Sequence, residues 1–174
     1  MEKQIINTPS APAPIGPYNQ GVRMGDMLFI SGQICIDPAT GKLNNQDIQQ
    51  ETHQVMHNLR AILEASDMSF HHVVKTTIFI TDMNRFSEVN EVYGKYFDSN
   101  STFPARETVQ VSALPKFVNV EISMIAVNAS TCQPNGSSTV VRASAPTTAT
   151  CVAASSSAAR RSSSSSRHAL ASRN

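Results

Sequence analysis

The chain has 174 residues, of which 14 are basic and 13 acidic, and its formal net charge at pH 7 is +1. This length corresponds to about one domain of 100 to 200 residues. The three cysteines show no C-x-x-C spacing, which excludes a disulfide framework and a zinc motif of the usual pattern. No run reaches the roughly 18 apolar residues of a membrane span and the N-terminus lacks an apolar signal core, so we expect a cytoplasmic protein.

The first regular elements are predicted on either side of Gly25 and Asp26. These two residues interrupt the apolar segment GVRMGDMLFISGQI, a pattern typical of a β-hairpin. We expect the paired strands over residues 19–24 and 27–34.

The segments that flank this hairpin are unusual. SAPAPIGPYNQGV is rich in proline and presents Tyr18 at the entrance to the first strand, either as a packing residue or as part of a site. Ser31 and Gly32 end the second strand, where a glycine indicates either a β-bulge or the close approach of a ligand to the backbone.

Two helices and a central strand follow. Apolar side chains recur at helical spacing in residues 44–66, with Asn45 as the candidate N-cap. Asp82 is expected to cap a second helix, on whose apolar stripe Asn90 lies, so that Asn90 should face inward and need a partner. The β-branched residues 71–82 predict a strand at the centre of a sheet.

His53 and His57 lie at positions i and i+4 of the first helix, which is the spacing of a metal-binding pair. They share a polar helix face with Arg60 and Glu64, so a solvated face is favoured over a metal site. The chain also shows no glycine-rich phosphate loop and no nucleophile elbow. We therefore expect neither a metal nor a cofactor.

The last two strands are predicted over residues 105–112 and 117–127, as a hairpin joined across residues 113–116. The expected order of elements is β-β-β-α-β-α-β-β. This order indicates an α+β fold with a mostly antiparallel sheet and both helices on one face. No element is left to cover the other, apolar face, so we expect a homo-oligomer that closes around the sheets.

Arg106 and Glu121 both lie in this apolar region, where a charged side chain needs a partner. One interpretation is structural, with Arg106 in a partly buried salt bridge to Glu107 or Glu121. The other is functional: Arg106 binds a substrate carboxylate through its planar fork, and Glu121 acts as an acid, a base or a holder of water. Sequence spacing does not decide between the two.

The composition changes after residue 128. Residues 1–128 have a net charge of −4, whereas residues 129–174 contain five arginines and no acidic residue. The second segment consists mainly of Ser, Ala and Thr and cannot bury enough apolar surface to offset its ordering entropy. We expect one domain over residues 1–128 and a disordered basic tail over residues 129–174, whose arginines are too dispersed for a nucleic-acid or membrane patch.

Several stretches taken together resemble the RidA/YjgF family of reactive-intermediate deaminases: IGPYNQG, SGQI, VVKTTIFITDM, VNEVY and FPARETVQVSALPKFVNVEISMIAV. The resemblance covers residues 1–128 in order and does not extend to residues 129–174. It implies a chorismate-mutase-like fold and a homotrimer with active sites in the clefts between subunits. It also implies cofactor-independent hydrolysis of enamines and imines, such as 2-aminoacrylate and 2-iminopropanoate, to 2-oxo acids and ammonium.

The same resemblance implies roles for individual residues. The arginine that grips the substrate carboxylate falls on Arg106, and the acid that places the attacking water falls on Glu121. Bacterial members often have cysteine two residues after the arginine, where this chain has threonine, so a role for a thiol is in doubt. The other residues that the resemblance places in the cleft are Tyr18, Ser31, Gly32, Asn90 and Thr108.

Two other functions are open at this level. A non-catalytic trimer that binds or senses 2-oxo or amino acids would use Arg106 in the same way, but it would gain nothing from an acid such as Glu121 near its anion. Nucleic-acid processing is disfavoured by the net charge of −4 on residues 1–128.

Overall fold

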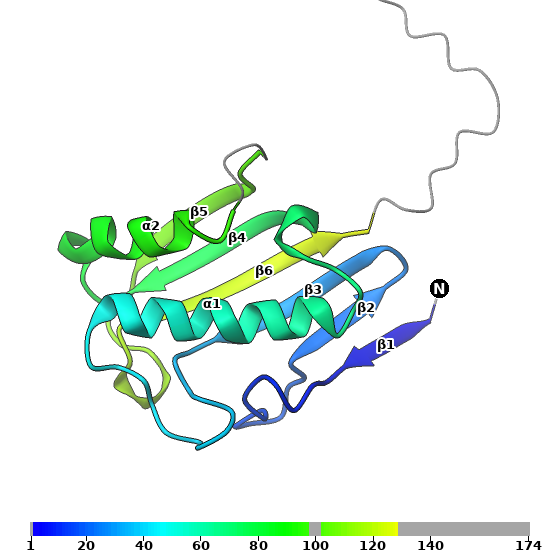
Figure 1. Ribbon diagram of the computed structural model, residues 1–174, viewed down its shortest axis with the longest axis horizontal. Coiled ribbons are helices and arrows are strands. Elements are labelled where there is room, and N and C mark those ends of the chain that lie inside the picture. Colours follow the sequence, from blue (N-terminus) through cyan, green and yellow to red (C-terminus); the bar gives the residue numbers. More distant parts are fainter. Residues whose placement is uncertain (1, 98–101, 129–174) are drawn as a thin grey trace, which may run out of the picture. The chain divides into compact units, whose positions relative to one another are not determined.

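The computed structural model describes residues 2–97 and 102–128 (Figure 1). Within these residues the elements follow the order β-β-β-α-β-α-β-β, as expected. The six strands form one mixed sheet in the order β1-β2-β3-β6-β4-β5. The elements are β1 (Lys3–Ile6), β2 (Gly21–Met24), β3 (Met27–Gln33), α1 (Ile48–Glu64), β4 (Val73–Ile80), α2 (Phe86–Gly94), β5 (Ala105–Gln110) and β6 (Val120–Val127).

The predicted hairpin is formed by β2 and β3. Met24 pairs with Met27 across the two-residue turn of Gly25 and Asp26. Gly25 has a φ of 59°, a left-handed conformation that glycine adopts without steric cost. The third strand that the expected order places ahead of the first helix is β1, which pairs antiparallel with β2.

Helix α1 begins later than its predicted cap. Asp47, and not Asn45, is the N-cap, and its side chain accepts a hydrogen bond of 2.8 Å from the backbone N–H of Gln50. The N-cap is the residue immediately before the first helical residue, and its side chain accepts from an N–H group two or three residues further on. Because α1 begins at Ile48, Asp47 has this position and Asn45 lies too far from Gln50. Asp82 accepts in the same way from Asn84, at the start of the short turn that leads into α2.

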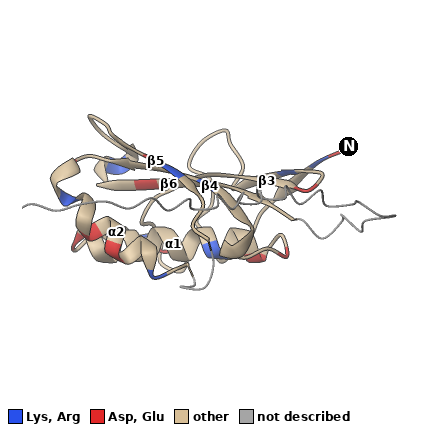
Figure 2. Cartoon of the chain, turned by 90° about the horizontal axis from the view of Figure 1, so that it is seen from above, with Lys and Arg blue, Asp and Glu red and all other residues tan. Residues whose placement is uncertain are grey.

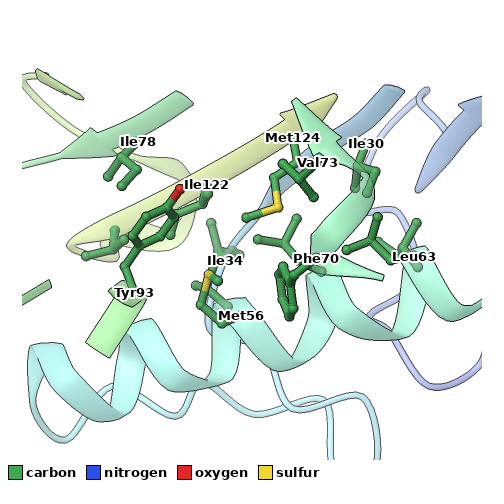
Figure 3. Close-up of a cluster of buried hydrophobic side chains, with 14 of the residues drawn as sticks. Ile30, Ile34, Met56, Leu63, Phe70, Val73, Ile78, Tyr93, Ile122 and Met124 are labelled. Atoms are coloured by element: carbon green, nitrogen blue, oxygen red, sulfur yellow. The ribbon is translucent and has the colours of Figure 1, made fainter. Parts of the chain in front are cut away.

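Both helices lie on one side of the sheet (Figure 2). Along β6, Val120, Ile122 and Met124 are buried on this side, whereas the residues between them are partly exposed on the other. In the core, Met56 of α1 and Tyr93 of α2 pack towards these strand side chains (Figure 3). The predicted layer arrangement is therefore confirmed.

The predicted hairpin between the last two strands is wrong. β5 pairs in parallel with β4, and β4 pairs antiparallel with β6, so β4 separates the two strands. β6 is buried on its helical side and lies inside the sheet, whereas β5 is an exposed edge strand. Neighbouring strands are about 4.8 Å apart, so the connection over residues 111–119 easily passes the end of one strand. Helix α2 supplies the crossover that a parallel pair requires.

The opposite face of the sheet is not covered by any described element. Met27 and Phe29 of β3 point to this bare face and are 41% and 42% exposed, and Val109 of β5 is 44% exposed. The expectation of an uncovered apolar face is confirmed, while the oligomer that would cover it stays a prediction. Among the described helices none is long and apolar enough to span a membrane.

Residues 129–174, the predicted tail, lie outside the described residues. Their removal is expected to leave the melting temperature and the size of the assembly unchanged, because a Ser/Ala/Thr-rich segment offers little apolar surface to pack. Thermal unfolding and sedimentation of the full chain and of a chain ending at Asn128 test this. A lower melting temperature or a smaller assembly after truncation would contradict the prediction.

Candidate functional site

The side chain of Arg106, on β5, lies against α2. Its guanidinium carbon is 5.3 Å from the ring centre of Phe86 and 5.1 Å from that of Tyr93. Nη1 donates a hydrogen bond of 2.7 Å to Oδ1 of Asn90. The two rings and the amide fix the orientation of the guanidinium, which is the condition for two-pronged binding of a carboxylate.

The ring of Tyr93 is itself anchored. Tyr93 is 2% exposed, and its hydroxyl donates a hydrogen bond of 3.2 Å to Oγ1 of Thr76 on β4. Burial raises the pKa of Tyr93, so its hydroxyl stays a proton donor to Thr76 at neutral pH. Thr108 lies two residues after Arg106 on the same face of β5 and is partly buried. Asn90, Arg106 and Thr108 form what we call the Arg106 cluster.

Asn90 does not face inward as predicted. Its side chain is exposed at the edge of the buried stripe formed by Val89 and Tyr93, and its hydrogen-bond partner is Arg106. The apolar stripe of this helix was predicted correctly, but Asn90 lies at the border of the stripe, where a polar side chain reaches Arg106 on β5.

The structural interpretation of Arg106 is wrong within one chain. No described carboxylate forms a salt bridge with Arg106. Glu107 instead pairs with Lys75 at 3.3 Å and accepts a hydrogen bond of 2.9 Å from Thr77. Glu121 lies beyond β4 and is not in contact with the guanidinium.

Arg106 and Glu121 lie on opposite faces of the sheet. Thr76, opposite Arg106 in the parallel pair, is fully buried beneath α2, so Arg106 points to the helical side. Glu121 alternates with Val120 and Ile122, which are fully buried on the helical side, so its carboxyl lies on the bare face. The Arg106 and Glu121 of one chain therefore do not meet at one ligand.

Glu121 is half-buried against an irregularity in β3. The pairing of β3 with β6 shifts register between Ile30 and Gln33, which places Ser31 and Gly32 in a bulge. A β-carbon at position 32 would overlap Oε1 of Glu121, so a glycine is needed to leave room for this carboxyl. Burial raises the pKa of Glu121. Such a carboxyl is suited to exchange a proton closer to neutral pH than an ordinary glutamate.

Ser31 connects this region to the proline-rich segment. Its hydroxyl donates a hydrogen bond of 2.7 Å to the carbonyl of Asn19, and its N–H donates one of 3.0 Å to the carbonyl of Gln20. Tyr18, next to Asn19, is 42% exposed, and its hydroxyl accepts a hydrogen bond of 3.2 Å from the N–H of Ile15. Ser31 is thus bonded to the residue that follows Tyr18 and precedes Gly32, which lies against Glu121. We call these four predicted site residues the Glu121 cluster: Tyr18, Ser31, Gly32 and Glu121.

A buried carboxylate that the sequence interpretation missed fixes the start of β6. Oε1 of the fully buried Glu51 accepts hydrogen bonds from the N–H groups of Asn119, at 2.6 Å, and Val120, at 2.8 Å. Oε2 accepts one of 3.0 Å from the side-chain amide of Asn119. These bonds hold the backbone just before Glu121. The missed signal is helical phase, because Glu51 lies three residues after Ile48 and four before Val55, both buried.

Of the two histidines at metal-pair spacing on α1, His53 is hydrogen-bonded to a tyrosine. Nδ1 of His53 lies 2.8 Å from the hydroxyl of Tyr96, which ties α1 to the end of α2. Within residues 2–97 and 102–128, no three His, Cys, Asp or Glu side chains gather as metal ligands would.

These features define a class of protein: an α+β domain with an arginine held in one orientation on the helical side of its sheet and a half-buried acid on the bare side. Comparison with known proteins identifies the family. The sequence model for endoribonuclease L-PSP matches residues 8–128. A RutC family protein of Pyrococcus horikoshii is 50% identical over 124 residues, which cover 71% of this chain and 97% of that relative.

Two further comparisons involve TdcF of Escherichia coli. In strain K12 this relative is named as a candidate reactive intermediate deaminase, and it is 47% identical over 126 residues, 72% of this chain and 97% of TdcF. The crystal structure of E. coli TdcF with bound serine superposes with a TM-score of 0.70 at 46% identity, covering 72% of this chain and 99% of that one. The chain therefore belongs to the Rid/YjgF family, also called the endoribonuclease L-PSP family.

Proposed function

We propose that this chain hydrolyses 2-imino acids and their enamine tautomers, such as 2-iminopropanoate and 2-aminoacrylate, to 2-oxo acids and ammonium. The observation that carries the proposal is the orientation of Arg106 by two aromatic rings and by Asn90, with no described acid as its partner. A guanidinium held in this way selects a planar carboxylate. The serine bound to the relative TdcF also carries a carboxylate and a nitrogen on the neighbouring carbon.

A second copy of the chain completes the proposed site. Because Arg106 and Glu121 of one chain lie on opposite faces, we place each site between the Arg106 cluster of one copy and the Glu121 cluster of the next. Such head-to-tail contacts close into a ring, here a homotrimer. The bare apolar face of the sheet provides the surface for this assembly.

The reaction needs orientation, a water molecule and a proton carrier. Arg106 holds the carboxylate, and water attacks the electrophilic carbon of the protonated imine while the neighbouring copy's Glu121 accepts one proton from the water molecule, which leaves a neutral carbinolamine. Glu121 then gives this proton to the nitrogen of the carbinolamine. The C–N bond breaks with its electron pair on nitrogen, the hydroxyl becomes the ketone, and the released hydroxyl proton leaves on ammonia as ammonium.

The test is ammonium release from 2-aminoacrylate generated in place by a pyridoxal-phosphate-dependent dehydratase. The full chain is expected to accelerate release beyond the rate with the dehydratase alone. Binding of pyruvate without any acceleration would overturn the proposal in favour of a non-catalytic binder. Although the family name refers to a ribonuclease, the net charge of −4 on residues 1–128 opposes binding to a phosphate backbone.

The pH dependence of kcat should report Glu121. In the substrate complex the substrate carboxylate neutralises Arg106, so burial dominates and keeps the pKa of Glu121 raised. Lowering the pH through this raised pKa protonates the base, and kcat should fall at a pH above the ordinary glutamate value of about 4.3. A pH profile of kcat measures this, and the acid limb should be absent from the residual activity of Glu121→Gln. If kcat of Glu121→Gln still fell at acidic pH, the titrating group would be a residue other than Glu121.

A further inference from the structure

The pocket beside Arg106 extends beyond the charged group. It has a volume of about 370 Å³ and lies between the C-terminal half of α2 and the residues that lead into β5. Arg106 and Asn90 form its polar end. Its other lining residues, none of which was predicted as a site residue, are Tyr93, Gly94, Phe103 and Pro104.

The walls away from Arg106 are apolar. Phe103 is 62% exposed, and its ring centre lies 5.8 Å from that of the buried Phe97, so the ring is in contact with the core while much of its surface stays accessible. Pro104 continues this wall into β5. A ligand whose carboxylate is held by Arg106 thus has apolar and aromatic surface next to it, which an apolar side chain would cover.

Gly94 forms part of the pocket wall and carries no side chain into it. A β-carbon built at this position meets no atom within 4 Å, so the space above Gly94 is open. Gly94 is the last residue of α2, where alanine would be the better helix former, so local helix stability does not explain the glycine. Its consequence in the structure is room for a ligand beside Arg106.

We propose that Gly94 and Phe103 form a side-chain subsite that selects 2-imino acids whose side chains are apolar and larger than methyl, such as branched aliphatic and benzyl groups. This inference rests on the proposed function, because it takes Arg106 as the carboxylate anchor. Each additional buried methylene should tighten binding about fourfold. The methyl side chain of 2-iminopropanoate is too short to cover the Phe103 wall.

The test compares three stable 2-oxo acids as ligands of the full chain: pyruvate, 4-methyl-2-oxopentanoate and phenylpyruvate. Calorimetry is expected to give a dissociation constant at least about tenfold lower for the two larger acids than for pyruvate. Gly94→Leu fills the open space and should remove most of this preference, and Gly94→Ala should remove part of it. Phe103→Ala should weaken phenylpyruvate binding more than pyruvate binding.

Ser87→Leu is the matched control. Ser87 is exposed two turns earlier on α2 and does not line the pocket, so the same added bulk there should leave the preference intact. Melting temperatures identify any variant that fails to fold. Because alanine favours the helix, Gly94→Ala should be at least as stable as the wild type.

The outcomes separate this inference from the proposed function. Equal affinities for the three acids in the wild type, or a preference that survives Gly94→Leu, would overturn the subsite. If the preference is present and sensitive to Gly94 but no imine is hydrolysed, the subsite stands and the hydrolytic function is refuted. If imines are hydrolysed at rates independent of side chain in both the wild type and Gly94→Leu, the function stands and the subsite is refuted.

Discussion

Replacing Glu121 by glutamine is expected to lower kcat by about 10² to 10⁴-fold and to leave the protein folded. The amide keeps the shape of the carboxyl against Gly32 but cannot take a proton from water. Binding of pyruvate should change little, because the carboxylate anchor is Arg106. This combination of lost turnover and retained binding separates a catalytic acid from a packing residue.

The direction in which Glu121→Gln changes the stability of the fold can also be predicted. Because burial raises the pKa of Glu121 in the folded state, its contribution to stability is present at low pH and is lost as the pH rises through the raised value. Glutamine has no charge to desolvate, so Glu121→Gln should unfold at the same or a higher temperature than the wild type at pH 7, with the difference shrinking towards pH 4. Thermal unfolding at both pH values measures this.

Glu107→Gln is the matched control for that experiment. Glu107 is an exposed carboxylate whose partners are Lys75 and Thr77, so its neutralisation should change kcat and stability only slightly. A Glu121→Gln variant that unfolds under the assay conditions, or one that turns over like Glu107→Gln, would refute the catalytic role.

Features set by local physics were predictable from the sequence. The turn at Gly25 and Asp26 needs a left-handed residue, which the sequence provides with a glycine, and the strands on either side followed. Helical periodicity located both helices. The uncovered apolar face followed from counting elements, because two helices cover only one side of a sheet.

Strand pairing was not predictable in the same way. The residues between β5 and β6 look like a hairpin loop because the two strands are adjacent in sequence, but burial draws the more apolar β6 into the sheet and leaves β5 at its edge. The face on which each strand presents its charge depends on that register, so the separation of Arg106 from Glu121 could not be found from spacing. The pocket around Gly94 is likewise formed by segments whose packing only the fold defines.

The second large effect concerns Arg106 and the division of the site between copies. Arg106→Ala removes both the positive charge and the paired N–H donors of the guanidinium. Arg106→Lys keeps the charge, but it loses the paired donors and the contacts of the planar guanidinium with the rings of Phe86 and Tyr93. Both variants should lose nearly all turnover, since the substrate carboxylate is no longer held in one orientation. Weakened pyruvate binding, measured by calorimetry, should accompany this loss and distinguishes Arg106 from Glu121.

Mixed assemblies then test where the two clusters meet. If each site takes Arg106 from one copy and Glu121 from the next, co-expression of Arg106→Ala with Glu121→Gln in equal amounts should restore activity in about one quarter of the sites, because both intact halves meet there by chance. Co-expression of Arg106→Ala with Arg106→Lys is the control and cannot restore any site. Sedimentation should show trimers in both mixtures. Recovery of activity only in the first mixture supports the shared site. Mixed trimers without recovered activity would refute it. An active monomer would refute it too, since a single chain holds Arg106 and Glu121 on opposite faces of its sheet.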